Sequence, residues 1–160
     1  MNEGDLLRSL RLRSLADAPD AFGQSFWEAR DRPPADWEAE ARRSSQGDAH
    51  AWFVARVGDA DVGTILGRRR RPDTLLVFSM WVDPDHRGLG IGRRLVAEVE
   101  AWGVSWGATN ILLWVFAENE GAVRFYERLG FRTEPAGPDA EAGATHEALA
   151  MRRPIPRERR

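Results

Sequence analysis

Two continuous apolar runs joined by one amphipathic helix constrain this fold more than any other feature of the sequence. The runs are TLLVFSMWV at 74–82 and NILLWVFA at 110–117, and each has the length of a strand buried on both faces. Between them, apolar residues at spacings of 4, 4, 3 and 4 form one face of a helix of about four turns: Ile91, Leu95, Val99, Trp102 and Trp106. A strand, a helix and a second strand predict a parallel crossover within one sheet.

The rest of the chain adds helices before this crossover and strands on both sides of it. Before the crossover, hydrophobic spacing and turn residues predict helices at 5–17 and 34–46, with an irregular segment at 18–33 between them. They also predict a hairpin of strands at 51–57 and 62–69, followed by a turn at 69–73. After the crossover we expect a helix at 120–129 and last strands at 131–133 and 146–152, with a Gly/Pro/Ala-rich loop between these two strands. We therefore expect an α/β fold whose mixed sheet carries helices on its faces.

Composition narrows the classes of protein to which this chain can belong. Its 160 residues suit one compact domain, and 23 basic residues against 25 acidic ones give no net field that would recruit nucleic acid. The chain has no cysteine, and all 23 basic residues are arginine, which excludes a thiol nucleophile, a thiolate metal site, a Walker A loop and a lysine Schiff base. We expect one cytoplasmic domain over 1–160, with a flexible tail from about 153 and no metal, nucleic acid or membrane partner.

Three glycines at alternate positions precede the long helix, in DHRGLGIGRRL at 85–95. Each glycine in a helix costs roughly 0.5–1 kcal/mol relative to alanine, so a bare backbone must serve a purpose there. An apolar strand, a glycine turn and a helix N-terminus predict an anion site, because free N–H groups and the helix dipole point to the same place. Arg87, Arg93 and Arg94 would add positive charge. The alternative is a tight turn with solvated arginines.

A dinucleotide-binding site is one class of phosphate site that the glycines could form. Its G-x-G-x-x-G fingerprint would begin at Gly88 and requires glycine at the position of Arg93. It also requires an acidic residue about 20 positions further on, where the chain has Gly107, Ala108 and Thr109. The sequence therefore argues against a Rossmann-type nucleotide binder.

The same glycines fit a different family. Arg87-Gly-Leu-Gly90-Ile-Gly92 resembles the pattern (Arg/Gln)-x-x-Gly-x-(Gly/Ala) of the GCN5-related N-acetyltransferase (GNAT) family. Downstream, ENEGAVRFYERLGF is similar to that family's second signature, Asn-x-x-Ala-x-x-x-Tyr-x-x-x-Gly-Phe, in Asn119, Ala122, Tyr126, Gly130 and Phe131. The core of the resemblance covers about 74–132. It implies a mostly antiparallel sheet with splayed central strands and a bulge near Ser79–Trp81. The family's usual first strand has no room in residues 1–4, so we expect either that this strand is absent or that the true start lies upstream.

The resemblance also implies acetyl-CoA as the co-substrate. Backbone amides of the glycine loop would hold its pyrophosphate, the main chain of the preceding strand would pair with its pantetheine arm, and Asn119 would hydrogen-bond that arm. Tyr126 would lie near the sulfur as the general-acid candidate. Asn119 can equally be a helix N-cap, and Tyr126 can equally be a core residue. The implied acetyl-CoA-binding residues are Trp81, Val82, Arg87, Gly88, Leu89, Gly90, Ile91, Gly92, Arg93, Asn119, Ala122 and Tyr126.

The expected reaction is direct attack of an amine on the thioester in a ternary complex, because no cysteine can carry the acetyl group. An unperturbed tyrosine, with a pKa of about 10, is a weaker acid than a thiol, at about 8.5. Tyr126 should therefore act mainly as a hydrogen-bond donor to the leaving thiolate. Many family members carry a glutamate on the strand before the glycine loop, but TLLVFSMWV has no carboxylate. Asp83 and Glu118 are the nearest candidates for a base.

The acceptor is the part of the reaction that the sequence specifies least. Aromatic side chains and a carboxylate in DAFGQSFWEAR could line a pocket for an ammonium group, or could simply pack against the sheet: Phe22, Phe26, Trp27 and Glu28. The arginines at 68–71 fit a solvated turn better than a patch for an acidic substrate. We expect an N-acetyltransferase that acts on a primary amine of a small molecule or peptide, in a chain that can form a homodimer. The alternative is a non-catalytic acyl-CoA-binding or sensing domain.

Overall fold

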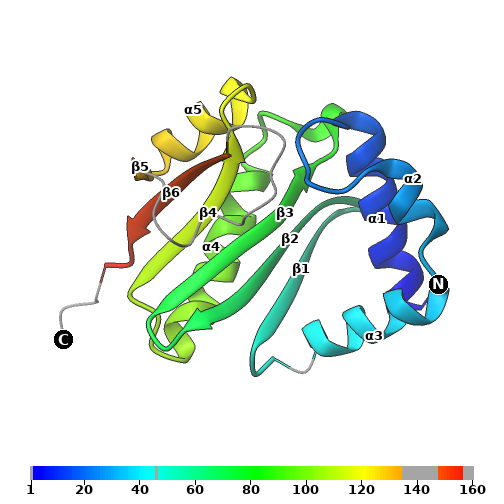
Figure 1. Cartoon of the computed structure of the whole chain (residues 1–160), viewed down its shortest axis with the longest axis horizontal. Helices are drawn as coiled ribbons and strands as arrows, with labels where there is room; N and C mark the ends of the chain where they lie inside the picture. The colour runs from blue at the N-terminus through cyan, green and yellow to red at the C-terminus, as the bar shows by residue number, and fades with distance from the viewer. Residues whose placement is uncertain (1, 46, 135–147, 157–160) are drawn as a thin grey trace.

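The structure is a computed structural model that describes residues 2–45, 47–134 and 148–156. Its helices are α1 (Glu3–Asp17), α2 (Phe26–Asp31), α3 (Pro34–Ser45), α4 (Ile91–Ser105) and α5 (Glu120–Arg128), with a short 3-10 helix at Pro84–His86. Its strands are β1 (His50–Val57), β2 (Ala60–Arg71), β3 (Thr74–Val82), β4 (Asn110–Phe116), β5 (Arg132–Glu134) and β6 (Ala148–Pro154). Within the described residues, the strands form one sheet in the order β1-β2-β3-β4-β6-β5 (Figure 1).

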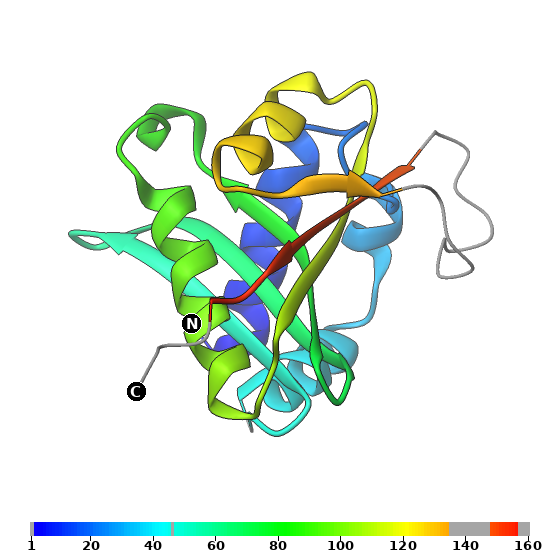
Figure 2. The ribbon, with the colours of Figure 1, turned by 90° about the vertical axis from the view of Figure 1, so that its left-hand side faces the viewer.

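The sheet is mixed and mostly antiparallel, as the sequence predicts. β3 and β4 form its parallel pair, with α4 as the crossover between them, and the other neighbouring strands are antiparallel. Helices α1, α2 and α3 cover one face, and α4 and α5 cover the other (Figures 1 and 2). The sheet begins with β1, so no strand precedes α1 in the part of the chain that the structure describes.

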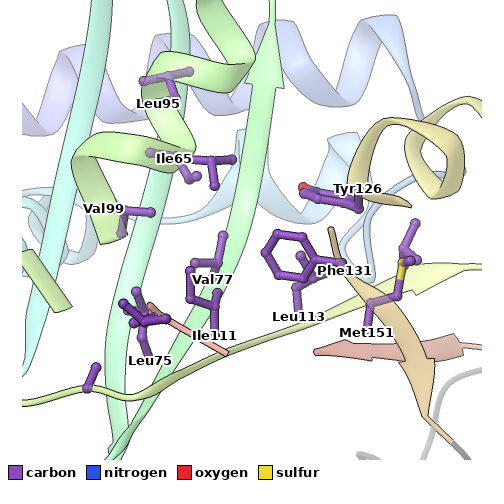
Figure 3. Close-up of a cluster of buried hydrophobic side chains, with 14 of the residues drawn as sticks. Ile65, Leu75, Val77, Leu95, Val99, Ile111, Leu113, Tyr126, Phe131 and Met151 are labelled. Atoms are coloured by element: carbon purple, nitrogen blue, oxygen red, sulfur yellow. The ribbon is translucent and has the colours of Figure 1, made fainter. Parts of the chain in front are cut away.

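A hydrophobic core lies on each face of the sheet. The larger core packs α4 and α5 against the strands, and its completely buried members include Ile65, Leu75, Val99, Ile111, Phe131 and Met151 (Figure 3). The smaller core, under α1, α2 and α3, is built on Leu7, Leu15, Trp37 and Leu66. Full burial of one such side chain stabilises the fold by about 1.5–3 kcal/mol. The two cores together fix the position of β3 between the two helical layers.

β3 separates from β4 after a short parallel pairing, and a bulge lies just beyond that point. The pairing of β3 with β4 covers only Thr74–Leu76 of β3. On the other edge, two residue steps of β2, from Thr64 to Leu66, oppose three steps of β3. Ser79 lies in this bulge with a φ of +51°, in the left-handed region that non-glycine residues rarely adopt. The predicted splay and the bulge near Ser79–Trp81 are therefore confirmed.

The bulge also decides which helical layer each side chain of β3 faces. Phe78 and Ser79 both face the layer of α1 and α3. Met80 packs in the core of α4 and α5, and the indole of Trp81 donates to Asp17 at the end of α1 (2.9 Å). In a regular strand Met80 would face the same layer as Phe78, because side chains alternate. The extra residue thus places Ser79 on the same face as Phe78 and shifts Met80 to the opposite face, towards α4 and α5.

One helix lies where the sequence predicted irregular structure. The segment at 18–33 contains α2, which begins with a capping box. The Ser25 hydroxyl accepts from the N–H of Glu28 (3.2 Å), and the Glu28 carboxylate accepts from the N–H of Ser25 (2.8 Å). A Ser-x-x-Glu sequence is the usual signal for this cap, so the sequence did contain the information.

Two further predictions of boundaries are corrected by the strands. β2 continues to Arg71, which pairs with Thr74, so the arginines at 68–71 lie on a strand and not in a turn. The predicted tail from about 153 overlaps a strand, because β6 runs to Pro154 and Ile155 is buried. Most of the predicted Gly/Pro/Ala-rich loop and the last four residues lie outside the described residues. No helix within the described ranges is long and apolar enough to cross a membrane.

Candidate functional site

The N-terminus of α4 presents backbone N–H groups that no side chain caps. Its N-cap residue is Gly90, with a φ of +81°, and Gly88 has a φ of +77°. Apart from the adjoining residues of the chain, no described atom lies within 4 Å of a Cβ built at either glycine, so the backbone faces open space. By contrast, α1 and α5 begin at Asn2 and Asn119, whose side chains accept backbone N–H groups. The first turn of α4 therefore offers its N–H donors and the positive end of its dipole to an anion.

The charge beside this turn comes from Arg93 and Arg94. Both are exposed, and neither forms an ion pair with the described part of the chain. Arg87 was also predicted to supply charge, but its side chain is directed away from the first turn of α4, towards Val82 and Asp17. Its Nε donates to the carbonyl oxygen of Val82 (3.0 Å), and its Nη2 donates to the carboxylate of Asp17. Arg87 thus fastens the loop to the end of α1, while its main chain stays in the glycine loop.

Tyr126, the single tyrosine of the chain, projects from α5 into the larger core (Figure 3). Its hydroxyl donates to the Sδ of Met80 on β3 (3.1 Å), and its ring meets Phe125 and Phe131 edge-on, with centroids 5.1 and 5.5 Å away. The residue is 8% exposed, and burial raises the pKa of its hydroxyl well above the ordinary value of about 10. The hydroxyl is therefore a donor that keeps its proton, beside the part of β3 that has left β4.

Gly92 has a different role from the two glycines before it. A Cβ at this position would lie 2.8 Å from the Cε of Met80 and 3.1 Å from the Cζ of Phe125. A larger residue would push both side chains, and both are in contact with Tyr126. The third glycine of the motif thus lets the first turn of α4 approach α5 and β3 closely.

The start of α5 holds three of the predicted residues. Asn119 is the N-cap, and its Oδ1 accepts from the N–H of Ala122 (3.2 Å), which confirms the capping role. Its side-chain nitrogen has no acceptor among the described residues and stays available to a ligand. Ala122 packs against the larger core. Glu118 is exposed in the turn between β4 and α5.

Asp83, the other carboxylate considered as a base, is held by three donors. It accepts from Nη2 of Arg13 (2.7 Å) and the N–H of Asp85 (3.0 Å), and its Oδ1 lies 3.3 Å from Nδ1 of His86. The hydrogen bond from Arg13 is the main cause that lowers the pKa of Asp83 below its ordinary value. A carboxylate held in this way is a weak proton acceptor at neutral pH. Among the described residues, no group of three or more His, Asp or Glu could hold a metal ion.

A cavity of about 230 Å³ lies on the other face of the sheet, between α1, α3 and the strands β2 and β3. Its walls are partly apolar, and its polar lining includes Arg11, Gln24, Arg32, Glu40 and Ser79. Sequence reasoning did not find this cavity. One signal was present, because Arg11 occupies the same face of α1 as the buried Leu7, Leu10 and Ser14. An arginine on a buried helix face requires an explanation.

Four residues were predicted for an acceptor pocket, and none of them lines this cavity: Phe22, Phe26, Trp27 and Glu28. Phe22 contacts a residue of the lining, because its ring stacks on the guanidinium of Arg11 at 4.7 Å. The side chain of Trp27 is 63% exposed. The Glu28 carboxylate caps α2, and the hydrogen bond from the N–H of Ser25 lowers its pKa. Glu28 thus stabilises a helix start and does not face the cavity.

Comparisons with known sequences agree with this geometry. The sequence model of the Acetyltransferase (GNAT) family matches residues 14–131. An uncharacterized N-acetyltransferase of Methanocaldococcus jannaschii is 33% identical over 90 residues, which make up 52% of this chain and only 40% of that protein. An acetyltransferase of Sodalis glossinidius is 30% identical over 112 residues, or 69% of this chain and 78% of that protein.

Solved structures share the fold over almost the whole chain. PaiA N-acetyltransferase of Thermoplasma acidophilum, in complex with coenzyme A, has a TM-score of 0.76 and 16% identity over 96% of this chain and 93% of that one. YncA of Salmonella typhimurium, solved with its cofactor acetyl-CoA, has a TM-score of 0.72 and 17% identity over 100% and 94%. The sequence match and the shared fold together place this chain in the GNAT family of acetyltransferases.

Proposed function

We propose that this protein transfers the acetyl group of acetyl-CoA to a primary amine of a small molecule or peptide, by direct attack in a ternary complex. The observation that carries the proposal is the uncapped N-terminus of α4 beside the half of β3 that has left β4. The amides from Arg87 to Gly92, with the side chain of Arg93, suit a pyrophosphate. The edge of β3 at Trp81 and Val82 suits a pantetheine arm, whose amides can pair with a strand.

The donor assignment has support from outside this chain as well. Two proteins of the same fold, PaiA and yncA, were solved with coenzyme A and acetyl-CoA. The absence of cysteine favours direct transfer, because no thiol can hold the acetyl group between two half-reactions.

The reaction forms one C–N bond and breaks one C–S bond. The amine nitrogen attacks the thioester carbonyl carbon, and the electron pair of the C–S bond leaves on sulfur. The acceptor loses one ammonium proton to solvent before the attack, and the second N–H proton neutralises the thiolate. Tyr126, with its raised pKa, keeps its own proton and donates a hydrogen bond to the developing thiolate. Its acceptor in this structure is already a sulfur atom, that of Met80, which supports the role.

Deprotonation of the acceptor has no dedicated base in this proposal. β3 carries no carboxylate, and Asp83 at its end is held by Arg13. Glu118 is the carboxylate that could act through water. An amine with a pKa near 10.4 is about 3.4 units from its neutral form at pH 7, which costs ~4–5 kcal/mol. We therefore expect kcat/KM to rise about tenfold per pH unit below the pKa of the acceptor.

Thiol release from acetyl-CoA across a panel of primary amines and short peptides tests this function. The proposal requires release that depends on an added amine, with the N-acetylated product identified by mass spectrometry. If acetyl-CoA binds but no amine raises release above background hydrolysis, the protein is the non-catalytic acyl-CoA-binding domain of the alternative hypothesis.

A further inference from the structure

An arginine without a counter-ion lines the cavity between α1 and β3, and it indicates the chemical class of the acceptor. Arg11 donates from Nε to the Oε1 of Gln24 (3.2 Å) and from Nη1 to the Oγ of Ser79 (3.3 Å), both neutral acceptors. The ring of Phe22 covers one face of the guanidinium. Three of its five N–H donors therefore have no acceptor within the described ranges.

The nearby arginines differ from Arg11 in having a carboxylate partner. Three of them are paired in this way: Arg13 with Asp83, Arg32 with Glu40, and Arg87 with Asp17. No carboxylate lies within 4.0 Å of the Arg11 guanidinium in the described part of the chain. Burial lowers the pKa of Arg11, and the charge of Glu40 only partly opposes this effect. A cation that is shielded from water and has no charged partner destabilises the fold, and a bound anion would offset that cost.

The size and charge of the cavity restrict that anion. The charged side chains in its lining are Arg11, Arg32 and Glu40, and they sum to one positive charge. A cavity of about 230 Å³ has room for a small molecule. Trp37 also lines the cavity, and its buried indole N–H has no acceptor in the described residues. The cavity thus fits a small monoanion.

The bulge in β3 lies between this cavity and the proposed site of acetyl transfer. Ser79, which accepts from Arg11, lines the cavity, and the next residue, Met80, accepts from Tyr126 on the opposite face. An anion held by Arg11 would therefore lie one residue along β3 from the place where the Tyr126 hydroxyl is proposed to meet the thioester sulfur. An amine close to that anion within the same molecule, two bonds from its carboxylate carbon, could reach the thioester.

Building on the proposed acetyl transfer, we propose that the acceptor is an α-amino acid with an apolar side chain. Its carboxylate binds Arg11, whose planar fork matches two carboxylate oxygens. Its side chain occupies the apolar part of the cavity, against Leu10, Leu66 and Phe78. Its amine lies towards the gap between β3 and β4.

Matched acceptors and matched variants test this proposal. Initial rates of thiol release are measured for leucine, for leucinamide, which lacks the negative charge, and for isoamylamine, which lacks the carboxylate altogether, each corrected for the fraction of neutral amine. The variants are Arg11→Gln, which removes the charge, Arg11→Lys, which keeps it, and Arg42→Gln on the exposed face of α3 as the control. Thermal unfolding and the KM for acetyl-CoA verify that each variant is folded and retains its donor site.

We expect leucine to be preferred over both analogues. Arg11→Gln should raise the KM for leucine roughly 10- to 100-fold and abolish the preference over leucinamide, because a charge-assisted hydrogen bond is lost. Arg11→Lys should restore part of the preference, and Arg42→Gln should change nothing. If all three amines react equally, or if Arg11→Gln keeps the preference, this inference is wrong while the acetyltransferase proposal stands.

A protein that binds acetyl-CoA without acetylating any amine would refute the proposed function, and the acceptor site would then be tested by binding. Leucine is titrated into the acetyl-CoA-bound protein and into the bound Arg11→Gln variant. Binding that is lost in the variant supports the amino acid site, and equal or absent binding overturns it.

Discussion

Replacing Tyr126 with phenylalanine removes one hydroxyl group and leaves the ring in contact with Phe125 and Phe131. The lost hydrogen bond runs to the Sδ of Met80, and a thioether is a weak acceptor, so no strongly polar group is left unpaired. We expect the free energy of unfolding to change by less than about 1 kcal/mol. The effect on turnover should be larger, because a hydrogen bond to a charged acceptor is worth about 1.5–3 kcal/mol. This corresponds to a kcat that is roughly 10- to 150-fold lower, with an unchanged KM for acetyl-CoA.

Two assays check this reasoning. Steady-state thiol release with an identified acceptor gives kcat and KM for the wild type and for Tyr126→Phe. Because the chain contains one tyrosine, ultraviolet titration of the folded protein follows that hydroxyl alone. Burial predicts that it ionises only above the ordinary pKa of about 10. Full kcat in the variant, or ionisation at or below pH 10, would refute the assignment of Tyr126 as a protonated donor to the thiolate.

The remaining predictions concern packing and pH. Gly67→Ala should lower the free energy of unfolding by about 1–3 kcal/mol in chemical denaturation, because the new Cβ would lie 2.5 Å from the stiff side chain of Val99. The control is Gly121→Ala, whose Cβ would meet nothing closer than 4.0 Å. Equal losses of stability in the two variants would contradict this packing. Asp83→Asn should leave the slope of log(kcat/KM) against pH unchanged, and a flattened slope would identify Asp83 as the base. Arg13 lowers the pKa of Asp83 in the folded state, so the ionised carboxylate stabilises the fold. This stabilisation of the fold is fully present above about pH 4, and it is lost as the pH falls through the lowered pKa of the folded state. Asp83→Asn should therefore make thermal stability less sensitive to acid, and an unchanged acid sensitivity would count against the ion pair.

The uncapped start of α4 and the cap of α5 could be predicted from the sequence because their determinants are local. The glycines before α4, the N-cap at Asn119 and the apolar strands β3 and β4 each depend on residues close together in the chain. The bulge at Ser79 could be expected only through the family resemblance, since nothing in TLLVFSMWV requires an extra residue. The local signals thus located the uncapped N-terminus of α4 but not the geometry of β3.

The cavity between α1 and β3 depends on contacts between distant parts of the chain, which a periodic pattern does not contain. Arg11 and Ser79 are 68 positions apart, and their contact exists only because α1 packs across the bulge. The arginines at 68–71 have turn-like neighbours, but pairing with β3 extends the strand through Arg71. Glu28 looked like a ligand for an ammonium group, whereas the Ser-x-x-Glu spacing around it marks the start of α2.

Whether the N-terminus of α4 holds the pyrophosphate is measured most directly by comparing the binding of acetyl-CoA with that of S-acetylpantetheine, which shares the thioester and the arm but lacks the pyrophosphate and the 3′-phosphoadenosine, with 3′-phosphoadenosine alone as the control for the nucleoside. If the amides at the N-terminus of α4 hold the pyrophosphate, acetyl-CoA at ~100 times its Kd stabilises the fold by ~2.7 kcal/mol, or roughly 5–10 °C in Tm. S-acetylpantetheine should then bind at least about tenfold more weakly in calorimetry. Equal affinities, or no binding of acetyl-CoA, would contradict the account.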